Sequence, residues 1–99
     1  MLFRSLAVIA SHSITGELYR VLAQELGSLV GRGAAGLSRS VAVITPQESK
    51  GLEFDTAIVV EPSRIVEEIT RGAAALYVAM TRPTQRLTLI ADGELPPGL

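Results

Sequence analysis

The chain has 99 residues, 47% of them hydrophobic and 19% charged, which is the composition of one small globular domain and excludes a disordered segment. The formal net charge of −1 excludes a general attraction to nucleic acid, and the absence of cysteine excludes disulfides and thiolate metal sites. No apolar run approaches the ~20 residues that span a bilayer, so we expect a soluble, cytoplasmic domain with no membrane partner.

Four short apolar runs, rich in β-branched residues, are the candidate strands. In chain order they cover residues 6–10, 41–45, 56–60 and 86–90. The first three are almost continuously apolar, as strands covered on both faces are in a parallel sheet. The last alternates in part between apolar and polar residues, which favours an edge position.

A first helix is expected between the first two runs. Over residues 15–26 the apolar side chains recur at helical spacing, and Gly27 follows where a C-terminal cap belongs. Residues 27–40 hold four glycines and two arginines, a composition that predicts a flexible connection.

Two further helical patterns lie between the third and fourth runs. One covers residues 63–70, and Arg71 and Gly72 interrupt it. The next, residues 73–82, is rich in alanine and mostly apolar, so we expect it to be buried; Pro83 ends it. Strands that alternate with helices predict an α/β layer fold with a mostly parallel sheet of about four strands.

Several catalytic signatures are absent from the sequence. There is no Walker A loop, because Ser49-Lys50-Gly51 has the wrong order and no preceding glycine. His12 is the only histidine, so a histidine-based triad or a multi-histidine metal site is not expected. We therefore expect no resident metal.

Residues 45–55 form a polar stretch between two expected buried strands. A turn that leaves a parallel strand is where α/β sheets place ligands, and Gly51 would let a ligand approach the backbone. The competing interpretation is an ordinary connection in which Lys50 and Glu53 form a surface ion pair of little energetic value. On these residues alone, the second interpretation is favoured.

Residues 76–82 end an apolar helix with a single arginine, Arg82. A cation near a helix C-terminus is favoured by the helix dipole by up to about 1 kcal/mol, which is a structural explanation. A guanidinium on a rigid helix is also well placed to bind a phosphate with two hydrogen bonds. The residues themselves do not decide between the two explanations.

Together the two stretches resemble motifs V and VI of the UvrD/Rep/PcrA group of superfamily-one helicases. Residues 50–54 read Lys-Gly-Leu-Glu-Phe, like motif V, and residues 77–82 read Tyr-Val-Ala-Met-Thr-Arg, close to the Tyr-Val-Ala-Leu-Thr-Arg of motif VI. The resemblance covers mainly residues 41–90 and, more weakly, residues 6–26. It implies that residues 1–99 are a single, partial C-terminal RecA-like domain of the P-loop NTPase type, belonging to a longer chain.

The resemblance also implies roles for individual residues. Arg82 would be the arginine finger that reaches the γ-phosphate of ATP, Glu53 would accept a hydrogen bond from the ribose, and Gly51 would lie near the nucleotide. Thr45 would contact the backbone of single-stranded DNA. Gln47 stands where these helicases usually carry a histidine that touches the strand, which is a departure from the pattern.

The implied activity is that of an ATP-dependent DNA helicase or translocase. ATP with Mg²⁺ would be bound mainly by the first RecA-like domain of the same parent chain, which carries the Walker motifs, and the fragment alone would be inactive. Single-stranded DNA is the expected partner.

Three alternatives remain. Residues 27–40 are too short for the accessory domain that UvrD proteins insert there, a layout that resembles HelD-like ATPases, which act on RNA polymerase. A non-enzymatic RecA-like binding module is a second alternative, against which the presence of Arg82 and Glu53 argues. A small-molecule enzyme of doubly wound fold is a third, for which no catalytic pair with a base is visible.

Overall fold

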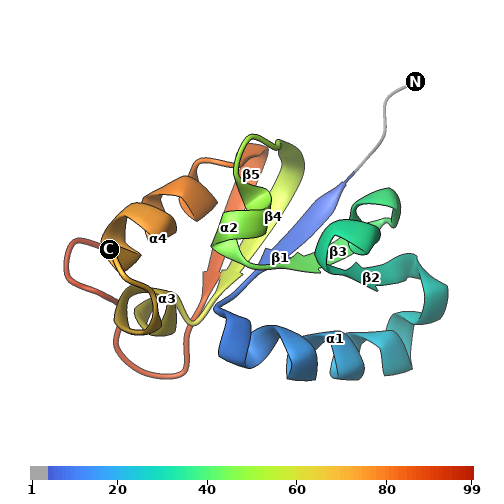
Figure 1. The fold of residues 1–99 in the computed structure, drawn as a ribbon, viewed down its shortest axis with the longest axis horizontal. Helices are drawn as coiled ribbons and strands as arrows, with labels where there is room; N and C mark the ends of the chain where they lie inside the picture. The colour runs from blue at the N-terminus through green and yellow to red at the C-terminus, as the bar shows by residue number, and fades with distance from the viewer. Residues whose placement is uncertain (1–4) are drawn as a thin grey trace.

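The structure is a computed structural model that describes residues 5–99 (Figure 1). Its centre is a sheet of five strands in the order β2-β3-β1-β4-β5, and every neighbouring pair is parallel. The strands are β1 (Leu6–Ile9), β2 (Val30–Arg32), β3 (Val41–Ile44), β4 (Phe54–Val60) and β5 (Pro83–Ile90). The predicted α/β fold with a parallel sheet is therefore confirmed, and the last strand lies at the edge as its alternation indicated.

Helices cover both faces of the sheet (Figure 1). The α-helices are α1 (His12–Leu26), α2 (Pro46–Ser49), α3 (Pro62–Glu68) and α4 (Gly72–Met80), and two 3₁₀ helices are η1 (Gly27–Leu29) and η2 (Gly33–Ser38). On one face Val8, Val30 and Val43 pack against α1. On the other face Ile9, Ile44 and their neighbours pack against α3 and α4. This two-sided burial explains why β1 and β3 are apolar at every position.

The segment predicted as a flexible connection, residues 27–40, is instead ordered around β2. Val30 is buried, and Gly31 pairs in register with Ala42 of β3. Gly31 also lies so close to Gly36 of η2 that a Cβ on either residue would overlap the other's backbone. The prediction was wrong because a strand of three residues is too short to show alternation, and glycines used for close approach look like glycines used for flexibility.

The alanine-rich helix α4 is not buried all round, contrary to expectation. Gly72, Leu76 and Ala79 face the core, whereas Tyr77 is 70% exposed. A Cβ at Gly72 would lie 2.6 Å from the Cα of Val66, so α3 and α4 are in direct backbone contact at this corner. The apolar composition of α4 therefore reflects small side chains on an open surface as well as core packing.

Because all strands are parallel, their carboxyl ends lie together on one side of the sheet and their amino ends on the opposite side. These two sides are called the carboxyl edge and the amino edge. The chain leaves β1, β3 and β4 at the carboxyl edge and enters β4 and β5 at the amino edge. Helix α4 runs from one edge to the other: it begins after α3 near the carboxyl edge and leads into β5 at the amino edge. No helix within residues 5–99 is long and apolar enough to cross a membrane.

Candidate functional site

The residues predicted to act together lie at two places. Residues 45–55 leave β3 at the carboxyl edge, form α2, and return along the sheet to enter β4 at the amino edge. Thr45 and Gln47 therefore lie at one edge, while Glu53 lies at the other with Arg82, the residue that precedes β5. The structure brings Arg82 and the Glu53 segment together and places Thr45 and Gln47 apart from them.

Arg82 is fixed at the amino edge by its own hydrogen bonds. Its Nε donates to the carbonyl of Val78 at 2.9 Å, one terminal nitrogen donates to the carbonyl of Leu52 at 3.2 Å, and the other donates to Oγ1 of Thr81 at 3.1 Å. The backbone carbonyl of Arg82 also accepts from the amide of Phe54 at 3.1 Å. A guanidinium has five N–H donors, so these bonds hold the group in place and leave one N–H on each terminal nitrogen for another acceptor.

This geometry bears on the two explanations of Arg82. The bond to Val78 is the helix-capping interaction expected of a cation at a helix C-terminus. The bond to Leu52 is not explained by capping, because it ties the guanidinium to the segment that carries Glu53. The arrangement has the fixed orientation that bidentate binding of a phosphate requires.

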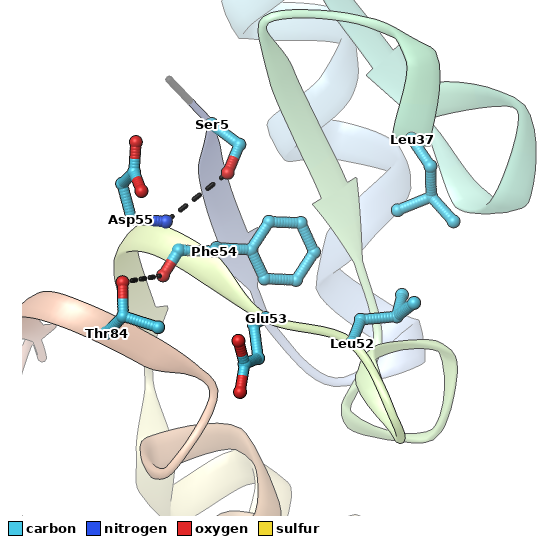
Figure 2. A pocket seen from close by; sticks show the side chains of 7 residues that line it. All are labelled: Ser5, Leu37, Leu52, Glu53, Phe54, Asp55 and Thr84. Carbon is cyan, nitrogen blue, oxygen red and sulfur yellow. Dashed lines mark hydrogen bonds between the residues drawn. The ribbon is translucent and has the colours of Figure 1, made fainter. Parts of the chain in front are cut away.

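A pocket of about 360 Å³ opens beside this segment (Figure 2). Its apolar side is made by Leu37, Leu52 and the edge of Phe54, and its polar side includes the carboxylates of Glu53 and Asp55. The walls are held by bonds between elements: Ser5 accepts from the amide of Asp55 at 3.3 Å, and Thr84 donates to the carbonyl of Phe54 at 3.3 Å. The mixture of an apolar ledge with carboxylates suits a small organic ligand with hydroxyl groups.

Glu53 lines this pocket and is exposed, and Gly51, two residues earlier in the chain, is also exposed. Gly51 has φ of 77°, a conformation that favours glycine, and no neighbour lies within 4 Å of the position a Cβ would take. The glycine is thus explained by backbone conformation, and the open space around it leaves room for a ligand. The nucleotide-binding roles of both residues stay predictions.

At the carboxyl edge, Thr45 caps the short helix α2. Its Oγ1 accepts from the amide of Glu48 at 3.2 Å, and Glu48 Oε1 accepts from the amide of Thr45 at 2.9 Å, which forms a capping box. Thr45 therefore has a structural role in shaping the turn, and its contact with single-stranded DNA stays a prediction. Gln47, two residues on, is exposed.

Sequence reasoning missed a second pocket, of about 350 Å³, between α2 and α4. Gln47 and Lys50 line it from one side, and Thr70 and Arg71 line it from the other. In the sequence, Arg71 stands out only as part of the break between two helical patterns. No sequence signal could have found the pocket, because it depends on the contact between α2 and α4.

A polar cluster joins α1 to α3 at the same edge. The Ser13 hydroxyl donates to both carboxylate oxygens of Glu68, at 2.7 and 2.9 Å, and Arg64 Nε donates to Glu68 at 2.7 Å. The hydrogen bond from Ser13, with that from Arg64, holds the pKa of Glu68 below its ordinary value. The cluster is solvent-exposed, so we assign it a role in fastening α1 to α3.

Comparison with known proteins gives two findings. The family model of the UvrD-like helicase C-terminal domain matches residues 40–90. Among solved structures, the crystal structure of the C-terminal domain of a possible DNA helicase from Lactobacillus plantarum WCFS1 is similar over 95% of this chain, with a TM-score of 0.73 and 30% sequence identity. The matched region is 60% of that chain, so the present chain spans less than two thirds of it. Curated protein sequences give no match.

Proposed function

Since the chain belongs to the family of UvrD-like helicase C-terminal domains, we propose that it forms the second, C-terminal half of an ATP-driven motor that moves along DNA. In this proposal the amino edge of the sheet completes an ATP site, and the carboxyl edge contacts single-stranded DNA. The first RecA-like domain, which carries the Walker motifs and binds Mg²⁺, supplies the other half of the ATP site. The chain alone is inactive.

The observation that supports the proposal most strongly is the orientation of Arg82. Three hydrogen bonds hold its guanidinium between the end of α4 and the Leu52 carbonyl, and two donors are left for a phosphate. A group that stabilises a transition state has to be positioned before the reaction, because reorganisation during the reaction would raise the barrier. A cation that serves only as a helix cap needs no bond to the segment that bears Glu53.

The proposed chemistry is hydrolysis of the terminal phosphoanhydride of ATP. Water attacks the γ-phosphorus, the bond to the β–γ bridging oxygen breaks, and ADP and inorganic phosphate form. Arg82 donates hydrogen bonds to the γ-phosphoryl oxygens and stabilises the charge that they carry in the transition state. Glu53 accepts a hydrogen bond from the ribose, and release of the products lets the two halves separate.

The test is ATP turnover by the full-length polypeptide that contains this chain, measured with and without single-stranded DNA. The proposal expects turnover that rises when the strand is added, because strand binding and hydrolysis are coupled in a translocase. A full-length protein that is folded, binds ATP and shows no turnover with single-stranded DNA or RNA polymerase would contradict it.

A HelD-like ATPase that acts on RNA polymerase is the second candidate. Gln47 replaces the histidine of the strand-binding helicases, and residues 27–40 form the compact β2 region in place of a large accessory domain. Turnover that rises with RNA polymerase and is indifferent to single-stranded DNA would favour this candidate over the DNA motor.

A further inference from the structure

The pocket between α2 and α4 has a positive lining. It contains the side chains of Lys50 and Arg71, the amide of Gln47 and the hydroxyl of Thr70, and no carboxylate belongs to it. Small apolar side chains from α4, among them Ala74 and Ala75, also line it. In a chain with a net charge of −1, two cations at one pocket are a local concentration of positive charge.

Neither cation is neutralised by its surroundings. Within residues 5–99 the side chains of Lys50 and Arg71 make no hydrogen bond or ion pair, and both residues are exposed. Arg64 of α3 behaves differently, since it is paired with Glu68 at 2.7 Å. Long cationic side chains that face one pocket without an acidic partner suit an anionic ligand.

The position of Arg71 is set by the backbone. Arg71 has φ of 62°, in the left-handed region that residues with a side chain rarely adopt. Gly72 follows it in contact with the backbone of α3, which fixes the corner between the two helices. The side chain thus projects from a rigid turn and not from a flexible loop.

Acidic groups gather at a different pocket. Around α3 and the C-terminal segment a separate pocket is lined by four carboxylates and one arginine, namely Glu61, Glu67, Asp92, Glu94 and Arg64. A polyanion would be repelled there and attracted to the α2–α4 pocket. The charge distribution therefore favours the α2–α4 pocket over the acidic pocket as a contact for single-stranded DNA.

We propose that a backbone phosphate of single-stranded DNA binds in the α2–α4 pocket between Arg71 and Lys50, with Arg71 as a strand-binding residue outside the two helicase motifs. The inference rests on the proposed function and extends it by identifying where the strand is held. The planar guanidinium of Arg71 binds the phosphate with two hydrogen bonds, and Lys50 contributes a point charge. Strand binding at this pocket is sequence-independent, because phosphates carry no base information.

The proposed contacts with single-stranded DNA and with the nucleotide lie at opposite ends of helix α4. Arg71 immediately precedes α4 and Arg82 follows shortly after its end, so the two arginines are separated by about 16 Å of helical rise.

The experiment measures affinity of the full-length protein for a short fluorescein-labelled oligo(dT), without nucleotide and over a range of salt concentrations. Arg71→Asn removes the charge but tolerates the left-handed backbone, and Arg71→Lys keeps the charge but loses the two-bond geometry. Arg20→Gln is the control, because Arg20 lies on α1 at the opposite face of the sheet. Thermal unfolding of each variant verifies folding.

The inference expects Arg71→Asn to weaken binding about tenfold and to reduce the slope of log affinity against log salt by about 0.7. Arg71→Lys should retain the slope and lose part of the affinity, and Arg20→Gln should match the wild type. If single-stranded DNA stimulates turnover but Arg71→Asn binds with unchanged affinity and slope, the inference is overturned and the proposed function stands. If the wild type neither binds the strand nor responds to it, the proposed function is overturned and the inference with it.

Discussion

The arginines at the two edges of the sheet differ in exposure and in internal hydrogen bonding. At the amino edge, Arg82 is half-buried and held by three hydrogen bonds from its guanidinium. At the carboxyl edge, Arg71 and Lys50 are exposed and make no side-chain bond within residues 5–99. The same helix, α4, lies between the two arginines.

The difference fits the two tasks that we propose for these residues. A group that stabilises a transition state must be held in one orientation, and internal hydrogen bonds provide that. A group that binds a moving DNA strand needs positive charge and hydrogen-bond donors that are free of internal partners, because its bonds to phosphate form and break as the DNA is bound and released. The contrast therefore supports a catalytic assignment for the amino edge and a binding assignment for the carboxyl edge.

The largest expected effect is that of Arg82→Ala on ATP turnover. We expect a fall of about 10³-fold or more in the full-length protein, because an arginine finger contributes 10³ to 10⁵ in rate in related chemistry. Arg82→Lys should recover little of it, since an ammonium cannot make the same set of hydrogen bonds. Arg20→Ala, on the opposite face of the sheet, serves as the control.

Arg82→Ala also removes three internal hydrogen bonds, so its folding has to be measured alongside its turnover. A folded variant with wild-type turnover would return Arg82 to a helix-capping role and remove the contrast between the edges.

The next effect concerns Glu53 at the amino edge. Glu53→Ala should raise the KM for ATP about tenfold, the expected cost of losing a hydrogen bond to a charged acceptor. The wild type should have a lower KM for ATP than for the analogue, 2′-deoxy-ATP or 3′-deoxy-ATP, that lacks the hydroxyl bound by Glu53. Glu53→Ala should have similar KM values for ATP and for that analogue. Glu94→Ala, on the exposed C-terminal segment, is the matched control. An unchanged KM and sugar preference would remove Glu53 from the nucleotide site.

Gly72→Ala tests whether the Arg71 corner is fixed by packing. The added Cβ would overlap the backbone of α3, so we expect a loss of about 1–3 kcal/mol in the free energy of unfolding. Gly16→Ala makes the same chemical change inside α1, where the nearest atom lies at an ordinary 3.4 Å, and should stabilise the chain by up to about 1 kcal/mol. Chemical denaturation compares them, and equal effects would show that the corner is not tightly packed.

The smallest effect is on the pH dependence of stability. The pKa of Glu68 is lowered in the folded state, first by the hydrogen bond from Ser13, so this carboxylate stabilises the fold above its unfolded pKa. That stability is lost as the pH falls through the folded pKa. Ser13→Ala should therefore lower the Tm at neutral pH and have a smaller effect in acid.

Ser63→Ala is the control for that experiment. Its hydroxyl donates to the carbonyl of Glu94 at 2.9 Å, a group that does not titrate, so its effect on the Tm should be the same at both pH values. A pH-independent effect of Ser13→Ala would mean that Glu68 does not link α1 to α3 through its charge.

Much of the fold was predictable because its central strands follow simple rules. Residues 6–9 and 41–44 are apolar at every position since both faces of β1 and β3 are covered. By contrast, β2 was not predictable, because its three residues include a glycine whose purpose is contact with Gly36. Local composition does not distinguish a glycine used in packing from one used in a loop.

The candidate site was predictable only in part, for a topological reason. The motifs identify Glu53 and Arg82, and the structure brings their segments together at the amino edge. Lys50 and Arg71 line one pocket because α2 contacts α4, and no sequence spacing specifies that contact. Contacts between distant segments need the fold before they can be inferred.

The most direct test of the division between the edges is the affinity for single-stranded DNA of Arg71→Asn and Arg82→Ala, measured side by side in the full-length protein without nucleotide. The account expects Arg71→Asn to bind about tenfold more weakly and Arg82→Ala to bind like the wild type. Equal losses in the two variants, or a loss confined to Arg82→Ala, would contradict the assignment of the carboxyl edge to the strand and the amino edge to ATP.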